Sequence, residues 1–371
     1  MLLCVGPALR QQPAQQSVAD GRAAGVLGAL LVTGAANLRW LCGFTGSSGL
    51  AIVGPGKARH FFTDFRYDEQ SAQQLDPVWT RHIAVDLPVA AGELLHELQS
   101  GRPLRVGFDD AGVTVARHRT IARAAGDGVD LVPAAGIVEE LRTVKEAPEI
   151  EAIHAAARLA DAALEEVLGR GLAGRTEREV AADLEITMRR AGAEGSSFPP
   201  IVASGPHGAL PHAEPRDEPI AAGVLVTIDW GARLDGYCSD CTRTVATGPV
   251  GETERRVYDL VLAAERAALA AARATGTGRD LDAVARAVIE EAGHGEHFGH
   301  GLGHGVGLEV HEGPRLSQRT DDELRAGQVV TIEPGVYLPG VCGVRIEDLV
   351  VLDDTGCRVL TALPTELRTI V

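Results

Sequence analysis

The chain has 371 residues, which corresponds to about two domains at the usual size of roughly 100–200 residues each. Its 45% hydrophobic and 23% charged residues are typical of a globular protein with a sizeable core, and they exclude a disordered chain. The net charge of −16 comes without a basic patch, so we expect no nucleic-acid partner.

Short apolar runs alternate with helix-like segments over residues 1–140, which predicts a small α/β domain. The N-terminus has no basic segment ahead of an apolar core, so we expect no signal peptide. The apolar stretch of residues 23–36 is too short and too glycine-rich to span a bilayer, which predicts no membrane partner. Strands are predicted at Ala29–Thr33, Leu50–Val53 and Ala58–Thr63, and helices at Glu93–Leu98 and Ala116–Ala125.

Residues 141–371 form the second predicted domain, in which the order helix, helix, hairpin occurs twice. Pro148 is well placed to open the first helix, and Thr176 with Glu179 forms a capping box for the second. The amino-acid sequence repeats as well: Val226-Thr-Ile-Asp-Trp-Gly231 matches Val330-Thr-Ile-Glu-Pro-Gly335. We interpret this as an internal duplication with the active site where its halves meet. The predicted helices are Glu149–Arg170, Thr176–Ala191, Glu252–Arg273 and Leu281–Ala292.

The first hairpin predicts two carboxylates close together. Asp235-Gly236 is its turn signal, and a hairpin centred between Leu234 and Asp235 puts Asp229 directly opposite Asp240. Their Cβ atoms would then lie about 4.5–5.5 Å apart. The alternative is an exposed hairpin whose charges reach into water, but both strands are apolar, which favours burial. Two buried carboxylates this close repel each other unless a positive charge lies between them.

The second hairpin repeats the pattern with glutamates. Strands at Gln328–Glu333 and Val344–Leu352 flank a Pro339-Gly340 turn and bring Glu333 near Glu347. If the two halves pack face to face, four carboxylates converge, and four buried negative charges require compensation. Two divalent cations that share a hydroxide would bring the local charge close to balance, which favours a dinuclear site over a single metal.

A glycine-rich stretch between the hairpins carries four histidines, of which at least one is expected to be functional although their spacing does not select it: His297, His300, His304 and His311. No G-x-x-x-x-G-K-[ST] motif supports a phosphate cradle instead. Oxygen-rich ligation with one imidazole suits manganese, cobalt, iron or zinc better than magnesium or calcium. The six cysteines lack a disulfide-framework spacing, so a reducing cytoplasm is expected, and Cys238-Ser-Asp-Cys241 lies in strand-like sequence, which disfavours a redox or zinc role.

Together these motifs resemble the pita-bread metallopeptidases, in the branch of the Xaa-Pro aminopeptidases and prolidases. The resemblance rests on Asp229–Ala232, Gly236–Thr244, Gly303–Glu312, Glu333–Tyr337 and Gly343–Asp348. Residues 37–47, 62–70 and 139–145 are similar to the creatinase-type domain and junction that precede the catalytic domain in this branch. The resemblance implies an α/β (α+β) chain, with a C-terminal pita-bread fold of pseudo-twofold symmetry after a smaller α/β domain.

The same resemblance implies a set of metal ligands. Asp229 would chelate one divalent cation, His304 and Glu333 would bind the other, and Asp240 and Glu347 would bridge both. Manganese is the expected metal, with cobalt, iron or zinc as alternatives. A hydroxide activated by both metals would attack the peptide carbonyl.

Further residues are implied to act on the substrate or to orient the ligands. Glu333 would also relay a proton to the leaving amine, while His212 would lie near the scissile bond. His311 would help to hold the carbonyl oxygen, and His300 would take another substrate-side position. Orientation of the carboxylates falls to Arg345 and Tyr337.

We therefore expect hydrolysis of an N-terminal Xaa-Pro bond in a proline-containing peptide, by an aminopeptidase that forms a homodimer. An Xaa-Pro dipeptidase, or prolidase, shares every motif and is the main alternative. A metal-free hydrolase like creatinase and a non-catalytic, protein-binding pita-bread module are remoter alternatives, because both typically lack metal ligands that this chain retains. A methionine aminopeptidase is disfavoured by the creatinase-type domain.

Overall fold

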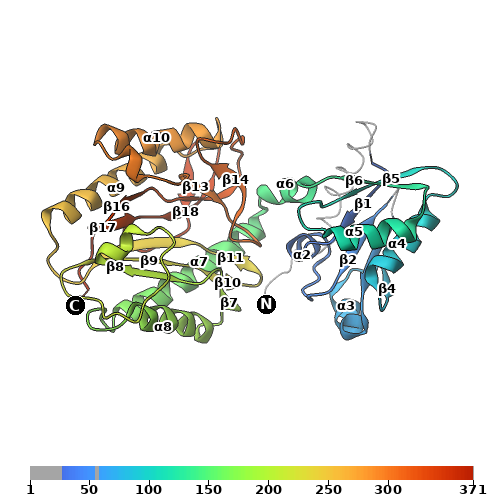
Figure 1. Ribbon diagram of the computed structural model, residues 1–371, viewed down its shortest axis with the longest axis horizontal. Helices are drawn as coiled ribbons and strands as arrows, with labels where there is room; N and C mark the ends of the chain where they lie inside the picture. The colour runs from blue at the N-terminus through green and yellow to red at the C-terminus, as the bar shows by residue number, and fades with distance from the viewer. Residues whose placement is uncertain (1–26, 55–57, 371) are drawn as a thin grey trace. The chain divides into compact units, whose positions relative to one another are not determined.

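The computed structural model describes residues 27–54 and 58–370, which form two compact units that divide between Arg142 and Thr143 (Figure 1). The expected absence of a signal peptide concerns residues that lie outside this range, as does Cys4. Among the described residues, none of the helices combines the length and apolar character that crossing a membrane requires.

The first unit is built on a six-stranded mixed sheet with the order β4-β3-β2-β1-β5-β6. Its central strand β1 pairs antiparallel with β2 and parallel with β5, and helices α4 and α5 pack their apolar residues against these strands. The predicted strands and helices of this unit are confirmed, with α4 beginning earlier than expected. The strands are β1 (Ala29–Val32), β2 (Leu50–Val53), β3 (Arg59–Thr63), β4 (Thr80–Ile83), β5 (Leu104–Phe108) and β6 (Val129–Pro133). The helices are α2 (Ala35–Cys42), α3 (Asp68–Gln74), α4 (Leu87–Leu98), α5 (Val115–Ala125) and α6 (Ile137–Thr143).

Two helix pairs frame the second unit, and they confirm the predicted helix order. They are α7 (Ala147–Leu168), α8 (Glu177–Arg190), α9 (Glu252–Ala271) and α10 (Gly278–Glu291). Thr176 and Glu179 form the predicted capping box at the start of α8, each accepting a hydrogen bond from the backbone N–H of the other. Pro148 lies in the first turn of α7, where the missing N–H of proline costs no helix hydrogen bond.

The strands of the second unit form several small sheets between the helix pairs. Their orders are β12-β9-β8, β11-β10-β7, β14-β13-β15-β18-β19 and β16-β17. The strands of the first half are β7 (Gly195–Ser196), β8 (Ile201–Ser204), β9 (Leu225–Trp230), β10 (Ala232–Leu234), β11 (Tyr237–Cys238) and β12 (Cys241–Ala246). Those of the second half are β13 (Gly303–Gly305), β14 (Glu312–Leu316), β15 (Val329–Ile332), β16 (Gly335–Leu338), β17 (Cys342–Arg345), β18 (Asp348–Leu352) and β19 (Cys357–Val359).

This unit has three layers, with strands between α7 and α8 on one side and α9 and α10 on the other (Figure 1). The alternate residues Val226, Ile228 and Trp230 of β9 belong to one apolar cluster with α7 and α8. A second cluster joins α9 and α10 to strands β15 to β18. Both helix layers therefore press on the strands that carry the acidic residues, and the strands are buried as predicted.

The register predicted for the first hairpin is wrong. Asp229 pairs with Thr242, not with Asp240, because the loop consists of Asp235 and Gly236 themselves. Both residues have a positive φ, as a two-residue hairpin loop of the mirror-image type requires, and this moves the hairpin centre by one residue. In the second hairpin, β15 confirms the first expected strand, whereas the strand expected at Val344–Leu352 is divided between β17 and β18, and a further strand, β16, precedes the turn.

Candidate metal centre

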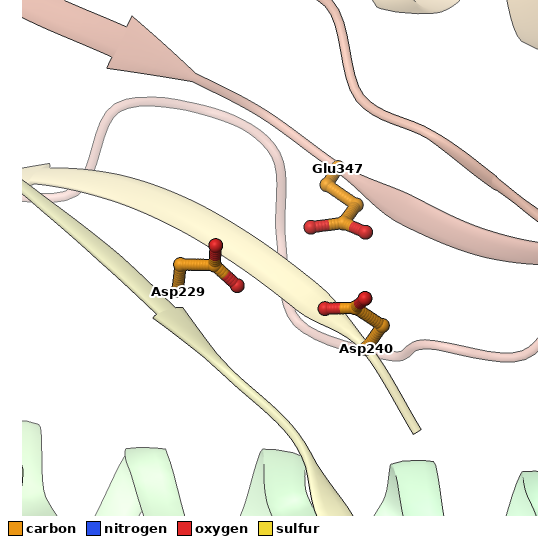
Figure 2. A group of neighbouring side chains, drawn as sticks. All are labelled: Asp229, Asp240 and Glu347. Carbon is orange, nitrogen blue, oxygen red and sulfur yellow. The ribbon is translucent and has the colours of Figure 1, made fainter. Parts of the chain in front are cut away.

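Three carboxylates meet where the two hairpins approach each other. Asp229 lies near the end of β9, Asp240 lies between β11 and β12, and Glu347 lies between β17 and β18. Figure 2 shows the three side chains pointing toward one another, and one carboxylate oxygen of each lies within 4.8 Å of the others. Asp229 pairs with Thr242 and so lies diagonally across from Asp240, yet the two carboxylates still lie close together.

Two oxygens of this cluster are buried without a partner. Oδ1 of Asp229 and Oε1 of Glu347 have no hydrogen-bond partner among the described residues. The other oxygen of each is held: Arg345 Nη2 donates to Asp229 Oδ2 at 2.6 Å, and Thr242 Oγ1 donates to Glu347 Oε2 at 2.7 Å. A buried carboxylate oxygen without a donor is costly, so this pair is well suited to bind a cation.

His304 and Glu333 extend the cluster on its other side. Nδ1 of His304 donates to the carbonyl oxygen of Gly305 at 3.1 Å, which leaves Nε2 of the neutral ring with a lone pair. That Nε2 lies 3.3 Å from Glu333 Oε1 and 3.6 Å from Asp240 Oδ2. Three electron-rich atoms thus face one another, which favours a cation between them.

The pKa values reflect the same crowding. Burial and the neighbouring negative charges raise the pKa of Asp240 and of Glu347 well above the ordinary range. Burial, opposed by Arg345 and reinforced by Asp229, raises the pKa of Glu333 to about 7. Burial, with the nearby His311, lowers the pKa of His304 to about 3. Carboxylates that resist ionisation are expected where several acids are buried with too little positive charge, and burial keeps the His304 ring neutral.

A hydrogen-bonded chain leads from Asp229 away from the cluster. Arg345, paired with Asp229, also donates from Nη1 to the hydroxyl of Tyr337 at 2.8 Å. Nδ1 of His300 donates to the carbonyl of Gly301, so its Nε2 accepts the Tyr337 hydroxyl proton at 2.8 Å. Burial and the positive charge of Arg345 lower the pKa of His300 to about 4, which keeps this ring neutral.

The cluster opens into a cleft of about 550 Å³ that is lined by all five expected metal ligands. His212 and His311 are exposed on its walls, and the His311 ring packs edge-on against His304 with centroids 4.4 Å apart. Apolar residues, including Phe198 and Ile201, line another part of the wall. The cleft thus brings the expected substrate-side histidines to the same space as the carboxylates.

The structure gathers nearly all of the residues named from the sequence, with His297 and Tyr337 outside the cleft lining. Two residues of the site were missed. Thr242 follows Asp240 by two positions, so a strand periodicity of two would have placed both on one face. Arg315 lines the cleft four residues after His311, and no local pattern in the sequence distinguishes it from a surface arginine.

Two helix–helix–hairpin halves around buried carboxylates are the arrangement of the pita-bread metallopeptidases. Residues 151–354 match metallopeptidase family M24, and residues 16–144 match the creatinase/prolidase N-terminal domain. The chain belongs to metallopeptidase family M24.

Known relatives agree with this assignment over most of their length. The chain is 41% identical to the uncharacterized peptidase YqhT of Bacillus subtilis, over 91% of this chain and 94% of the relative. It is similar to the solved Xaa-Pro dipeptidase from Bacillus anthracis, with a TM-score of 0.92, 36% identity and coverage of 98% and 100%. It is also similar to an X-Pro aminopeptidase from Thermotoga maritima, with a TM-score of 0.86, 38% identity and coverage of 96% and 100%.

Proposed function

We propose that this chain hydrolyses the peptide bond that precedes proline, with two divalent cations bound by its acidic cluster. The observation that carries the proposal is the pair of unpartnered, buried oxygens on Asp229 and Glu347, beside Asp240 and the lone pair of His304. Specificity for proline is supported by the Bacillus anthracis and Thermotoga maritima relatives, whose names describe an Xaa-Pro dipeptidase and an X-Pro aminopeptidase.

The residues fit two cations better than one. Asp229 would chelate the first, His304 and Glu333 would bind the second, and Asp240 with Glu347 would bridge them. When bound, the two cations supply Lewis acidity and make a hydroxide available near neutral pH. Manganese is the metal we propose from the resemblance to the Xaa-Pro peptidase branch, and the ligand set also suits cobalt, iron and zinc.

The protein side chains then handle protons and the carbonyl oxygen. Glu333, whose Oε1 lies 3.3 Å from His304 Nε2 in the cleft, would accept a proton as general base and pass it to the leaving amine. His212 and His311 face the cleft, where an imidazole N–H would donate to the carbonyl oxygen as negative charge develops. Arg345, backed by Tyr337, fixes the orientation of Asp229.

Metal dependence and proline specificity are tested together by a substrate panel. Protein stripped of metal is assayed on Xaa-Pro, Xaa-Pro-Yaa and Xaa-Ala-Yaa peptides, with each divalent cation added back in turn. We expect hydrolysis only with added metal and only before proline. Full activity after exhaustive chelation, or equal activity on the alanine peptides, would contradict the proposal. Metal binding should also raise the free energy of unfolding, by roughly 2.7 kcal/mol when the free metal concentration is 100 times the dissociation constant, and the unfolding temperature should rise with it.

The expected aminopeptidase activity has one specific rival, the Xaa-Pro dipeptidase. Arg315 favours the rival because it lines the cleft near His311, whose pKa is lowered by burial and then by the positive charge of Arg315. Arg345 is the other arginine of the cleft lining and is committed to Asp229, which leaves Arg315 to meet a substrate carboxylate. Only in a dipeptide does the residue after the scissile bond carry a free carboxylate.

Paired substrates separate the two activities. Arg315→Gln should raise KM for an Xaa-Pro dipeptide by roughly 10- to 100-fold, the loss of a charge-assisted hydrogen bond. The matched Xaa-Pro amide lacks the charge and should show little change. If both substrates respond equally, Arg315 does not read the carboxylate, and the aminopeptidase remains the proposed activity.

Two properties of the whole protein complete the proposal. We infer a homodimer from the resemblance to the Xaa-Pro peptidase branch, and light scattering of the purified chain tests it. A reducing, cytoplasmic location is supported by the unpaired state of the five described cysteines: Cys42, Cys238, Cys241, Cys342 and Cys357.

A further inference from the structure

One loop of the second unit brings His212 to the cleft. It comprises residues 205–215, and we call it the His212 loop. It begins with a short 3₁₀ turn at Gly205–Ala209 and then has no regular secondary structure before β9. Its later residues line the cleft: Pro211, His212, Ala213, Glu214 and Pro215. A segment without its own helix or strand hydrogen bonds must be held by other parts of the molecule if its side chains are to be fixed.

A single buried carboxylate ties the two ends of this loop together. Glu177, the first residue of α8, has a side chain with no exposed surface. Its Oε1 accepts from the backbone N–H and the hydroxyl of Ser204, both at 2.8 Å, and from Arg216 Nη2 at 3.3 Å. Its Oε2 accepts from His207 Nδ1 at 2.9 Å, from the backbone N–H of Arg216 at 3.0 Å and from Arg216 Nε at 3.2 Å. Ser204 and Arg216 flank the loop directly, and His207 lies in its first turn.

The far side of the loop is anchored to the metal site itself. Nη1 of Arg345 donates to the carbonyl oxygen of Pro211 at 3.3 Å, one residue before His212. The backbone at Gly208 packs directly on β17, where a Cβ added to Gly343 would lie 1.7 Å from the Gly208 carbonyl oxygen. With its ends clamped by Glu177 and its middle attached to Arg345, the loop can present His212 in one position.

We propose that Glu177 is a positioning residue of the active site, acting through the His212 loop; this rests on the hydrolysis proposed above. All six groups that hydrogen-bond to Glu177 are donors. An ionised carboxylate matches them because both of its oxygens accept hydrogen bonds and neither donates. Glutamine has the same shape but turns an amide N–H toward half of these donors. Misplacement of a substrate-contacting group by about 1 Å costs roughly 100-fold in rate, so a slack loop has a large effect.

A purely structural role as a helix-end acid is the competing explanation. Acidic residues in the first turn stabilise a helix whatever lies beyond it. Glu179 provides the matched comparison, because it lies one half-turn along α8, is exposed, and has a side chain that accepts from the backbone N–H of Thr176. A helix-end effect would appear in both residues, whereas an effect through the loop would be confined to Glu177.

A double-mutant cycle with His212 tests the proposal. Glu177→Gln should lower kcat/KM on an Xaa-Pro substrate by roughly 10- to 100-fold, with metal affinity within about twofold of the wild-type value. In the His212→Ala background the same substitution should change kcat/KM by no more than about twofold, because the group it positions is already gone. Glu179→Gln should leave kcat/KM near the wild-type value. An equal loss in both backgrounds, or no loss in either, would overturn the proposal.

Two additions keep the outcome clear. If Glu177→Gln does not fold, His207→Ala removes one donor and keeps the carboxylate, and its smaller loss should likewise disappear in the His212→Ala background. Hydrogen exchange of residues 204–216 should be faster in Glu177→Gln than in Glu179→Gln, and this readout needs no substrate. Wild-type protein that never hydrolyses Xaa-Pro peptides would refute the proposed function, while unchanged exchange in Glu177→Gln would refute the positioning role by itself.

Discussion

Glu347 and Asp348 are consecutive acids, 1% and 4% exposed, whose surroundings differ in kind. Side chains of successive residues in extended chain point to opposite sides. Glu347 faces the cleft, and its Oε1 has no hydrogen-bond partner among the described residues. Asp348 faces away from it, and its Oδ1 accepts from Arg243 Nη2 and from the Thr361 hydroxyl, each at 2.6 Å.

The two sides balance charge in different ways. Behind the site, Arg243 neutralises Asp348, while burial raises the pKa of Glu265 to about 8 and that of Asp161 to about 6. One arginine, protonation of Glu265 and the backbone N–H of Ala362 that donates to Asp161 therefore suffice there. On the cleft side, several carboxylates share Arg345 and border open space of about 550 Å³. A buried acid is best interpreted as a metal ligand when it has both an unpartnered oxygen and a cavity beside it.

The largest effect is expected on the cleft side. Glu347→Ala should lower kcat by on the order of 10³-fold, equivalent to about 4 kcal/mol of barrier, through loss of a bridging ligand. The unfolding free energy of metal-free protein should stay the same or rise, because an uncompensated buried carboxylate is removed. Steady-state kinetics, calorimetric metal titration and urea unfolding measure these effects. Retained turnover would contradict the ligand assignment.

The neighbouring substitution should have the opposite profile. Asp348→Ala leaves Arg243 buried without its countercharge, so the unfolding free energy should fall by about 3–5 kcal/mol. Asp354→Ala, in the exposed turn that follows β18, is the control and should change it by no more than about 0.5 kcal/mol. Urea unfolding of metal-free protein measures both. A small effect of Asp348→Ala would mean that Arg243 finds another partner and that the two sides differ less than proposed.

The long helices were predictable because their apolar faces and caps recur over several turns, as with Thr176 and Glu179 at the start of α8. The ends of the helices were less predictable. Helix α7 begins two residues before the predicted start, because Glu146 and Glu149 form a capping box there. Strand β4 was not predicted, since it has four residues, half of them exposed and half partly buried, without a clear alternation.

The acidic residues of the site were predictable as residues but not in their exact pairing. The hairpin register depends on which two residues form the turn. Asp235 and Gly236 both have positive φ values and form it, whereas the predicted register placed the turn one residue earlier. Supporting contacts such as Thr242 to Glu347 join residues 105 positions apart. No local pattern in the sequence carries that information, because it arises only when the two halves pack.

A pH-dependent prediction sharpens the comparison on the interior side. The pKa of Glu265 rises from its ordinary value of 4.5 to about 8 through burial and the negative charge of Asp348. Between these values the folded protein holds a proton that the unfolded chain releases, so the unfolding free energy falls as pH rises through this window. Glutamine has no such proton. Glu265→Gln should therefore gain stability relative to wild type as pH rises, by roughly 2–4 kcal/mol in total.

Urea unfolding at about pH 5 and about pH 8 measures this difference. Glu252→Gln is the matched control, because Glu252 begins the same helix and is exposed, so its stability difference from wild type should stay constant. A pH-independent difference for Glu265→Gln would show that Glu265 is ionised in the folded protein. The interior side would then carry more negative charge than Arg243 balances.

The smallest effects come from two threonines that make the same kind of contact on opposite sides. Thr361 donates to Asp348 at 2.6 Å, and Thr242 donates to Glu347 at 2.7 Å while accepting from Arg345 Nε at 3.0 Å. Thr361→Val should lower the unfolding free energy by roughly 1–2 kcal/mol, the loss of one hydrogen bond to a charged group, and leave kcat unchanged.

Thr242→Val removes a similar hydrogen bond but also frees a carboxylate whose orientation matters for cation binding. Loss of a group that orients a metal ligand typically costs 10- to 100-fold in metal affinity or activity, so a fall of about that size is expected here. Calorimetric metal titration and kcat on an Xaa-Pro substrate measure it, with Thr361→Val as the control. If the two valine variants lose equal activity, the interior network is coupled to the metal site through the peptide unit that joins Glu347 to Asp348, and the two sides act as one.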